Sequence, residues 1–196
     1  MVKRIGGVVM VLALLALGAV SAACSAASPT PRPFEGSADG YASYGYGEGS
    51  GTDGLSNVLG CNVDLPVDEF YKVTTFTSAD GTADDLGAVH LEFDHCPGNT
   101  GMDQGQIAFV TDNGDVLYGE YQGTYEADGA HASIEFKANS STGTCYLLND
   151  VACASTGRFA NATGEATVIA DAYPGDPSDP FVPWPWHGTW TGTLSY

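Results

Sequence analysis

Hydrophobic and polar residues alternate along most of the chain after residue 58, which is the spacing of half-buried β-strands. Residues 87–93 illustrate this pattern, because three apolar side chains share one face while His90 and Glu92 share the other. Such strands are predicted over 71–77, 87–93, 106–111, 115–126, 132–138, 165–172 and 188–196, with a hairpin between Cys145 and Cys153. About eight short antiparallel strands predict an all-β sandwich or a closed barrel.

The stretch STGRFANATGEATV, residues 155–168, predicts a turn that leads into one of these strands. Gly157 provides freedom in φ for the turn, and Gly164 allows a neighbouring strand to approach closely. We expect Phe159 to tuck under the rim of the barrel, and Arg158 to be exposed or to pair with a nearby acid. These residues are therefore predicted to be structural.

Residues 172–188 contain five prolines, which interrupt the interior of a regular strand. This segment is predicted to be a long loop between the last two strands, and long loops are often functional. Trp184 and Trp186 within it can grip a ligand or a sugar, because aromatic faces provide a large contact area. The alternative is that both rings close one end of the barrel as a hydrophobic plug.

Few residues in the chain form a pattern typical of catalysis or metal binding. His90 and His95 are five residues apart on a predicted strand, so they face opposite sides. The acidic segment 78–85 lacks the spacing of an EF-hand and is predicted to be a solvated loop. The sequence shows no nucleophile elbow, so we predict no catalytic residues, no metal site and no cofactor.

The first residues are typical of an export signal. Lys3 and Arg4 precede an apolar run that ends near residue 20, which is short for a membrane-spanning helix. Ser21-Ala22-Ala23-Cys24 resembles a bacterial lipobox, so residues 1–23 are predicted to be a lipoprotein signal peptide and Cys24 the lipidated residue. The expected location is extracytoplasmic, with lipid anchoring to the bacterial cell membrane. Release of a secreted protein by ordinary signal peptidase is the alternative.

Composition divides the remaining chain in two. Residues 24–58 are rich in Gly, Ser, Pro and Tyr, which predicts a flexible tether. Residues 59–196 have the length of one domain and contain 20 acidic but only three basic residues. This acidic surface argues against nucleic acid as a partner, because nucleic-acid binding needs a cationic surface.

Four cysteines remain after Cys24, and an even number in an exported domain predicts two disulfides. Cys145 and Cys153 flank a predicted hairpin tip, so their local pairing is the simplest of the three possible arrangements. Cys61 then pairs with Cys96. A zinc site is the alternative, but the chain contains no CxxC motif to support it.

Four segments together resemble a known group of proteins: GAVHLEF, NGDVLYGEYQGTY, TGRFANATGEATV and GTWTGTLSY. Over about 86–196 they are similar to exported bacterial calycin-like barrels of the allene oxide cyclase and dirigent type. The resemblance implies a small closed antiparallel barrel of about eight strands. It also implies a possible enzyme or guide protein with polar groups in an apolar barrel, and Glu120 and Asp171 are the acids considered for such a cavity.

These observations lead to three functional hypotheses. The first is a barrel that binds a small apolar or aromatic ligand, and its candidate residues are Trp184, Trp186, Trp190 and Tyr121. The second is a cyclase-like or dirigent-like protein, which predicts at least two buried polar groups that converge in the interior. The third is a structural surface lipoprotein whose interior is filled by side chains. The oligomeric state is left open.

Overall fold

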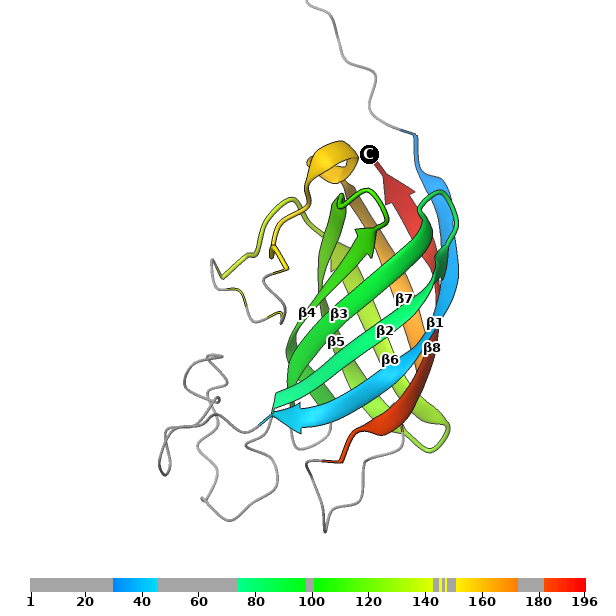
Figure 1. Cartoon of the computed structure of the whole chain (residues 1–196), viewed down its shortest axis with the longest axis vertical. Coiled ribbons are helices and arrows are strands. Elements are labelled where there is room, and N and C mark those ends of the chain that lie inside the picture. Colours follow the sequence, from blue (N-terminus) through cyan, green and yellow to red (C-terminus); the bar gives the residue numbers. More distant parts are fainter. Residues whose placement is uncertain are drawn as a thin grey trace, which may run out of the picture.

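Eight antiparallel strands form one closed barrel in a computed structural model of the chain (Figure 1). Each strand pairs with its neighbour in sequence, and β8 closes the barrel on β1. The strands are β1 (Arg32–Gly45), β2 (Thr74–Ala83), β3 (Gly87–Pro97), β4 (Gly101–Thr111), β5 (Val116–Glu126), β6 (Gly129–Phe136), β7 (Thr163–Ala172) and β8 (Trp184–Ser195). The structure describes residues 30–45, 74–97, 101–142, 145, 147, 151–172 and 182–196.

The all-β class and the closed eight-stranded barrel are confirmed. The alternation predicts these strands correctly because most described interior positions carry an apolar or small side chain, with Thr77 and His95 among the polar exceptions, while most outer positions are polar. The strand predicted at 115–126 corresponds to β5, which begins one residue later and ends at the same residue. Among the described residues, no helix is both long enough and apolar enough to cross a membrane.

One strand lies where the sequence predicts a tether. Residues 32–45, within the predicted tether 24–58, form β1, so this part of the prediction is wrong and the barrel begins before residue 59. The inward side chains of β1 are Phe34, Ala38 and Ala42, all buried. Such small residues provide a weak apolar signal, which is why the strand looks like a linker. Residues 46–58 lie outside the described residues.

In the predicted cysteine hairpin, the described residues 147, 151 and 152 are not part of a strand, and the other residues between Cys145 and Cys153 lie outside the described residues. The eighth strand of the barrel is β1 instead. Two loop predictions also fail. Residues 78–83 of the predicted acidic loop belong to β2, and β8 begins at Trp184 within the predicted loop 172–188. Pro185 lies at the start of β8, where the described residues pair it with Tyr41 of β1 only, and a proline is tolerated at the end of a strand.

The barrel end beside the C-terminus is uppermost in Figure 1, and we call it the upper end. Aromatic rings fill the interior near this end. Phe34 contacts Phe109, Phe136 and Trp190, with ring centroids 5.4, 5.1 and 6.2 Å apart. The Trp190 ring lies against Gly36 of the neighbouring strand, where a Cβ atom would collide with it. This half of the interior is therefore a packed core.

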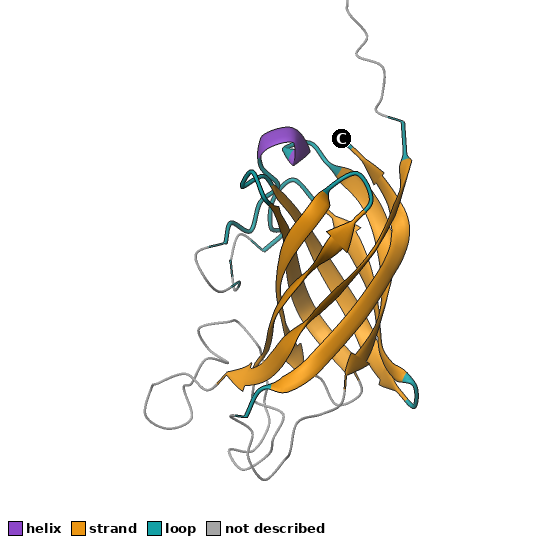
Figure 2. Cartoon of the chain, turned by 45° about the vertical axis from the view of Figure 1, so that its right-hand side comes forward, coloured by secondary structure: helices purple, strands orange, loops and turns teal. Residues whose placement is uncertain are grey.

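A short 3-10 helix, η2 (Gly157–Phe159), covers the upper end beside the C-terminus (Figure 2). Phe159 is fully buried and meets Tyr196 edge-on at 4.9 Å, which confirms it as the anchor under the rim. Gly157 and Gly164 have positive φ values of 55° and 149°, as the turn requires. Arg158 lies 3.9 Å from Asp115, so the expected acidic partner is also confirmed.

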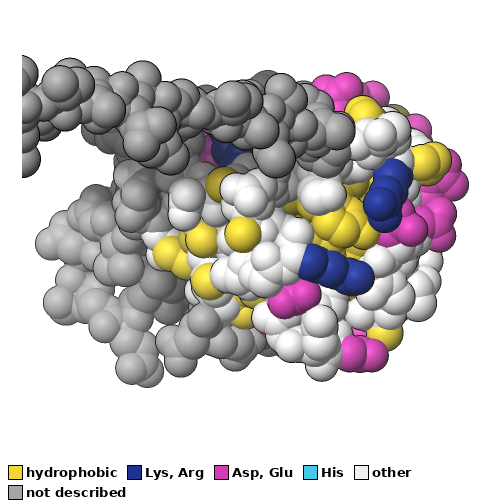
Figure 3. Space-filling model, turned by 90° about the horizontal axis from the view of Figure 1, so that it is seen from above, with side chains coloured by type: hydrophobic (Ala, Val, Ile, Leu, Met, Phe, Trp, Pro, Cys, Tyr) yellow, Lys and Arg dark blue, Asp and Glu magenta, His cyan; other side chains and the backbone are white. Residues whose placement is uncertain are grey.

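Figure 3 looks onto this end and shows basic side chains beside apolar ones, with acids around them. Arg32 lies over the Tyr196 ring at 5.3 Å, and Arg158 lies over the Phe159 ring at 4.7 Å. The arginine stems and the stacked rings seal the end of the barrel.

We call the segment between β6 and β7, residues 137–156, the strap, and its described part lies on the outer face of β4 and β5. Its described part is tied to β5 by hydrogen bonds, including Thr156 N–H to the Val116 carbonyl at 2.8 Å. Leu147 of the strap packs in one apolar cluster with Tyr118 of β5 and Ala108 of β4. The predicted disulfide Cys145–Cys153 is confirmed. Cys61 and the side chain of Cys96 lie outside the described residues.

Candidate functional site

The lower end of the barrel contains a buried histidine held by two tyrosines. His95 points inward from β3, and only 4% of its surface is exposed. Its Nδ1 lies 2.8 Å from the Tyr121 hydroxyl, and its Nε2 lies 2.7 Å from the Tyr125 hydroxyl. Tyr121 is buried whereas Tyr125 is exposed, so the three residues link solvent to the interior.

Burial sets the protonation states of this group. It lowers the pKa of His95 to about 3, so the imidazole is neutral at physiological pH. Burial also raises the pKa of Tyr121 well above its usual value, so this hydroxyl keeps its proton. A neutral imidazole has one N–H donor and one acceptor nitrogen, so one tyrosine donates to His95 and the other accepts from it.

A second polar group in the same region has no partner. Thr77 is 2% exposed, and its Oγ1 forms no hydrogen bond in the described structure. Thr77 pairs with Phe93 across β2 and β3, and His95 is the next inward residue along β3. A buried hydroxyl without a partner carries a free-energy cost of about 1–3 kcal/mol, so it needs an explanation.

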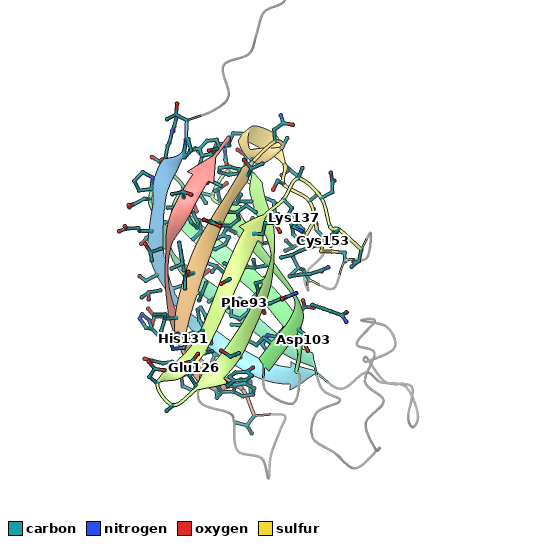
Figure 4. All side chains as sticks on the ribbon, turned by 180° about the vertical axis from the view of Figure 1, so that it is seen from behind. Phe93, Asp103, Glu126, His131, Lys137 and Cys153 are labelled. Atoms are coloured by element: carbon teal, nitrogen blue, oxygen red, sulfur yellow. A yellow bond between two sulfur atoms is a disulfide. The ribbon has the colours of Figure 1, made fainter. Side chains whose placement is uncertain are left out.

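Aromatic side chains surround these polar groups. The Phe93 ring lies 4.9 Å from the Trp186 ring and 6.3 Å from the Tyr121 ring, measured between centroids. Trp184 is partly buried and packs against the same core. Figure 4 shows Phe93 in the barrel interior. The lower end therefore combines flat apolar surfaces with a few hydrogen-bonding groups.

The structure brings together three of the four ligand-binding candidates. Trp184, Trp186 and Tyr121 lie at the lower end, the last two around Phe93. Trp190 instead belongs to the packed upper cluster with Phe34 and Phe109.

Sequence reasoning missed His95, Tyr125 and Thr77 as members of this site. The strand predicted at 87–93 ends two residues too early. Extending its alternation by one step would have placed His95 on the apolar inner face, as the structure does. His90 and His95 do face opposite sides, as predicted.

The outer face of β2 and β3 holds an arrangement that resembles a catalytic triad. His90 Nδ1 lies 2.7 Å from Asp80, and its Nε2 lies 3.4 Å from the Ser78 hydroxyl. However, Nε2 is only 2.8 Å from the Glu92 carboxylate. Burial lowers the pKa of His90, but the hydrogen bonds to Asp80 and Glu92 outweigh it, so the pKa is raised. A histidine that donates to two carboxylates holds both protons and is a poor base for Ser78.

Glu120 and Asp171, the two acids considered for a cavity inside the barrel, both lie on its outer face. Glu120 points outward beneath the strap, where it accepts hydrogen bonds from the Ser141 main chain and hydroxyl and pairs with Lys137 at 3.0 Å. Asp171 is exposed on the outer face of β7. Neither residue faces the barrel interior, so the cavity role considered for them is wrong.

Comparison with known proteins gives no family assignment. No protein-family model matches the chain, and no curated protein and no solved structure matches it significantly. What the geometry establishes is the class, a closed eight-stranded antiparallel barrel.

Proposed function

We propose that this barrel binds a small aromatic or apolar molecule that carries one hydrogen-bonding group, at its lower end. The observation that carries the proposal is the unpartnered Thr77 hydroxyl beside Phe93. Ligand sites are mostly apolar and contain a few placed polar groups that fix the orientation of the ligand. Thr77, Tyr121 and His95 are such groups, and Phe93 and Trp186 provide the apolar walls.

The protonation state of His95 supports a hydrogen bond from Tyr121 to the ligand. When Nδ1 carries the imidazole proton, His95 donates to the Tyr121 oxygen, and the Tyr121 hydroxyl hydrogen is free to donate elsewhere. Tyr125 then donates to Nε2. A ligand oxygen that reached both Thr77 and Tyr121 would accept a hydrogen bond from each hydroxyl.

A cyclase-like or dirigent-like enzyme of the calycin type is the second candidate. The observation that favours it is the continuous hydrogen-bond path from exposed Tyr125 through His95 to buried Tyr121. Such a path can move one proton between solvent and a bound intermediate. The third candidate is a structural surface lipoprotein. The observation that favours it is the upper half of the interior, which is packed with aromatic side chains.

Native mass spectrometry of the full chain, exported so that its disulfides form, tests the binding function. We expect an additional noncovalent mass, or one acquired from a panel of small aromatic compounds, that disappears on denaturation. A bare mass that no compound changes would contradict the binding proposal and favour a structural barrel.

We further propose export of the chain and lipid anchoring through Cys24. The Cys145–Cys153 disulfide supports an oxidising compartment. β1 begins at the upper end with Arg32, so an extended chain places Cys24 within about 28 Å of that end. The upper end would then face the membrane, and the lower end would open away from it.

Replacing Cys24 with serine tests the anchor. We expect the wild-type chain to fractionate with membranes and the Cys24→Ser chain to be recovered in the soluble exported fraction. The change leaves the barrel strands untouched, so both chains should unfold at the same temperature. Equal membrane association of the two chains would show that lipid on Cys24 does not hold the protein there.

A further inference from the structure

Three histidines on the outer surface of the described barrel are paired with aspartates. His90 lies 2.7 Å from Asp80, His131 lies 2.9 Å from Asp128, and His187 lies 2.8 Å from Asp39. Pairs of this kind are common on acidic surfaces and stabilise a protein little. The three pairs differ in the position of a second carboxylate near the histidine ring.

Among the described histidines, His131 is the one whose ligand atom lies close to those of two carboxylates that are also close to each other. Glu126 ends β5, Asp128 lies in the tight turn that follows, and His131 faces outward from β6. One ligand atom from each lies within 4.8 Å of the others, and in the described residues this is the one such group of three. Figure 4 shows Glu126 and His131 together at this hairpin.

The other two histidines lack this geometry. The carboxylates that contact His90 lie at opposite ring nitrogens, Asp80 at Nδ1 and Glu92 at Nε2, so one ion cannot bind them together with the ring. His187 contacts Asp39 through Nδ1, and the described structure gives it no second carboxylate. The three pairs therefore provide an internal comparison within one protein.

We propose that Glu126, Asp128 and His131 form a binding site for a divalent transition-metal ion of the zinc class. One imidazole nitrogen and two carboxylate oxygens are ligands that Zn²⁺ accepts, and water completes the coordination of an exposed site. The formal net charge of −18 attracts cations to the surface.

The hairpin also carries Tyr125, between Thr124 and Glu126, and the Tyr125 hydroxyl bonds to His95. A metal that joins both sides of the turn would hold this part of β5 and β6 together. The metal site stands on its own residues and does not depend on the ligand-binding proposal.

Zn²⁺ titration of the full chain, purified without a polyhistidine tag, tests the site by calorimetry and by thermal unfolding. We expect saturable binding of one ion and a rise in melting temperature that grows with free Zn²⁺. His131→Ala should weaken binding at least tenfold, as should Asp128→Asn. His187→Ala is the matched control, because it removes a histidine–aspartate pair without a third ligand, and it should bind Zn²⁺ like the wild type.

Three results would overturn the proposal. They are the absence of saturable binding to the wild type, unchanged affinity in His131→Ala, or an equal loss in His187→Ala. All these positions are at least partly exposed, so the variants should fold, and the melting temperature without metal verifies this.

Discussion

Replacing Asp94 with asparagine is expected to stabilise the protein at neutral pH. Asp94 is 1% exposed on the outer face of β3, and neither carboxyl oxygen has a hydrogen-bond partner in the described structure. Burial raises the pKa of Asp94 to about 8, and the nearby Gln106 main-chain N–H opposes this only in part, without reaching hydrogen-bond geometry. The folded protein therefore keeps a proton that the unfolded chain releases above pH 4.

The pH dependence follows from this difference. Between about pH 4 and 8 the native state binds more protons than the unfolded state, so the contribution of Asp94 to stability falls as pH rises. Asparagine does not titrate in this range, so the Asp94→Asn protein lacks this dependence of stability on pH. We expect Asp94→Asn to raise the free energy of unfolding by about 2–4 kcal/mol at pH 7 and to have little effect near pH 3.

Denaturant unfolding at several pH values measures this prediction. Asp103→Asn, an exposed change on neighbouring β4, is the matched control and should alter stability by less than about 0.5 kcal/mol. A destabilised Asp94→Asn protein, or a gain that is the same at pH 3 and pH 7, would show that Asp94 is not held as a neutral acid.

Replacing Phe159 with alanine should have the largest destabilising effect. Phe159 is fully buried, and it joins η2 to Tyr196 at the end of the chain and to the Arg158 side chain. Removing the ring leaves a cavity at the sealed upper end. We expect a loss of about 3–5 kcal/mol in the free energy of unfolding.

Ile169→Ala is a suitable control, because Ile169 is an apolar residue of β7 that is 47% exposed on the outer face. Its replacement should cost about 1 kcal/mol or less. If Phe159→Ala were as mild as this control, the upper end would not be a packed cap, and the role assigned to η2 would have to be abandoned.

How far the sequence predicts this structure depends on the type of side chain. The strand at 115–126 and the turn at 155–168 were predictable, because alternation, an aromatic anchor and two glycines each indicate one local structure. β1 was not, because Ala38 and Ala42 share their face with glycines, and this composition is also typical of a linker. Its role depends on a partner far away, since β1 pairs with β8 near the end of the chain.

The candidate site was predictable only in part for a similar reason. The aromatic character of Trp186 and Tyr121 predicts them as ligand-binding candidates, and both rings lie around one other ring, that of Phe93. The missing member is Thr77, because a threonine in a strand is ordinary until its neighbours show that its hydroxyl is buried and unpaired. Tertiary pairing determines this, and alternation alone cannot reveal it.

The most direct test of the binding site compares 2-naphthol with naphthalene, two rings that differ by one hydroxyl, in fluorescence titrations of the wild type and of Thr77→Val. The site predicts that the wild type binds 2-naphthol about five to ten times more tightly than naphthalene, because a net hydrogen bond contributes about 1 kcal/mol. Thr77→Val should lose most of this preference while its affinity for naphthalene is unchanged. Thr191→Val, on the outer face of β8, should behave like the wild type. Equal preference in the wild type and Thr77→Val, or no binding of either compound, would contradict a ligand site at the lower end.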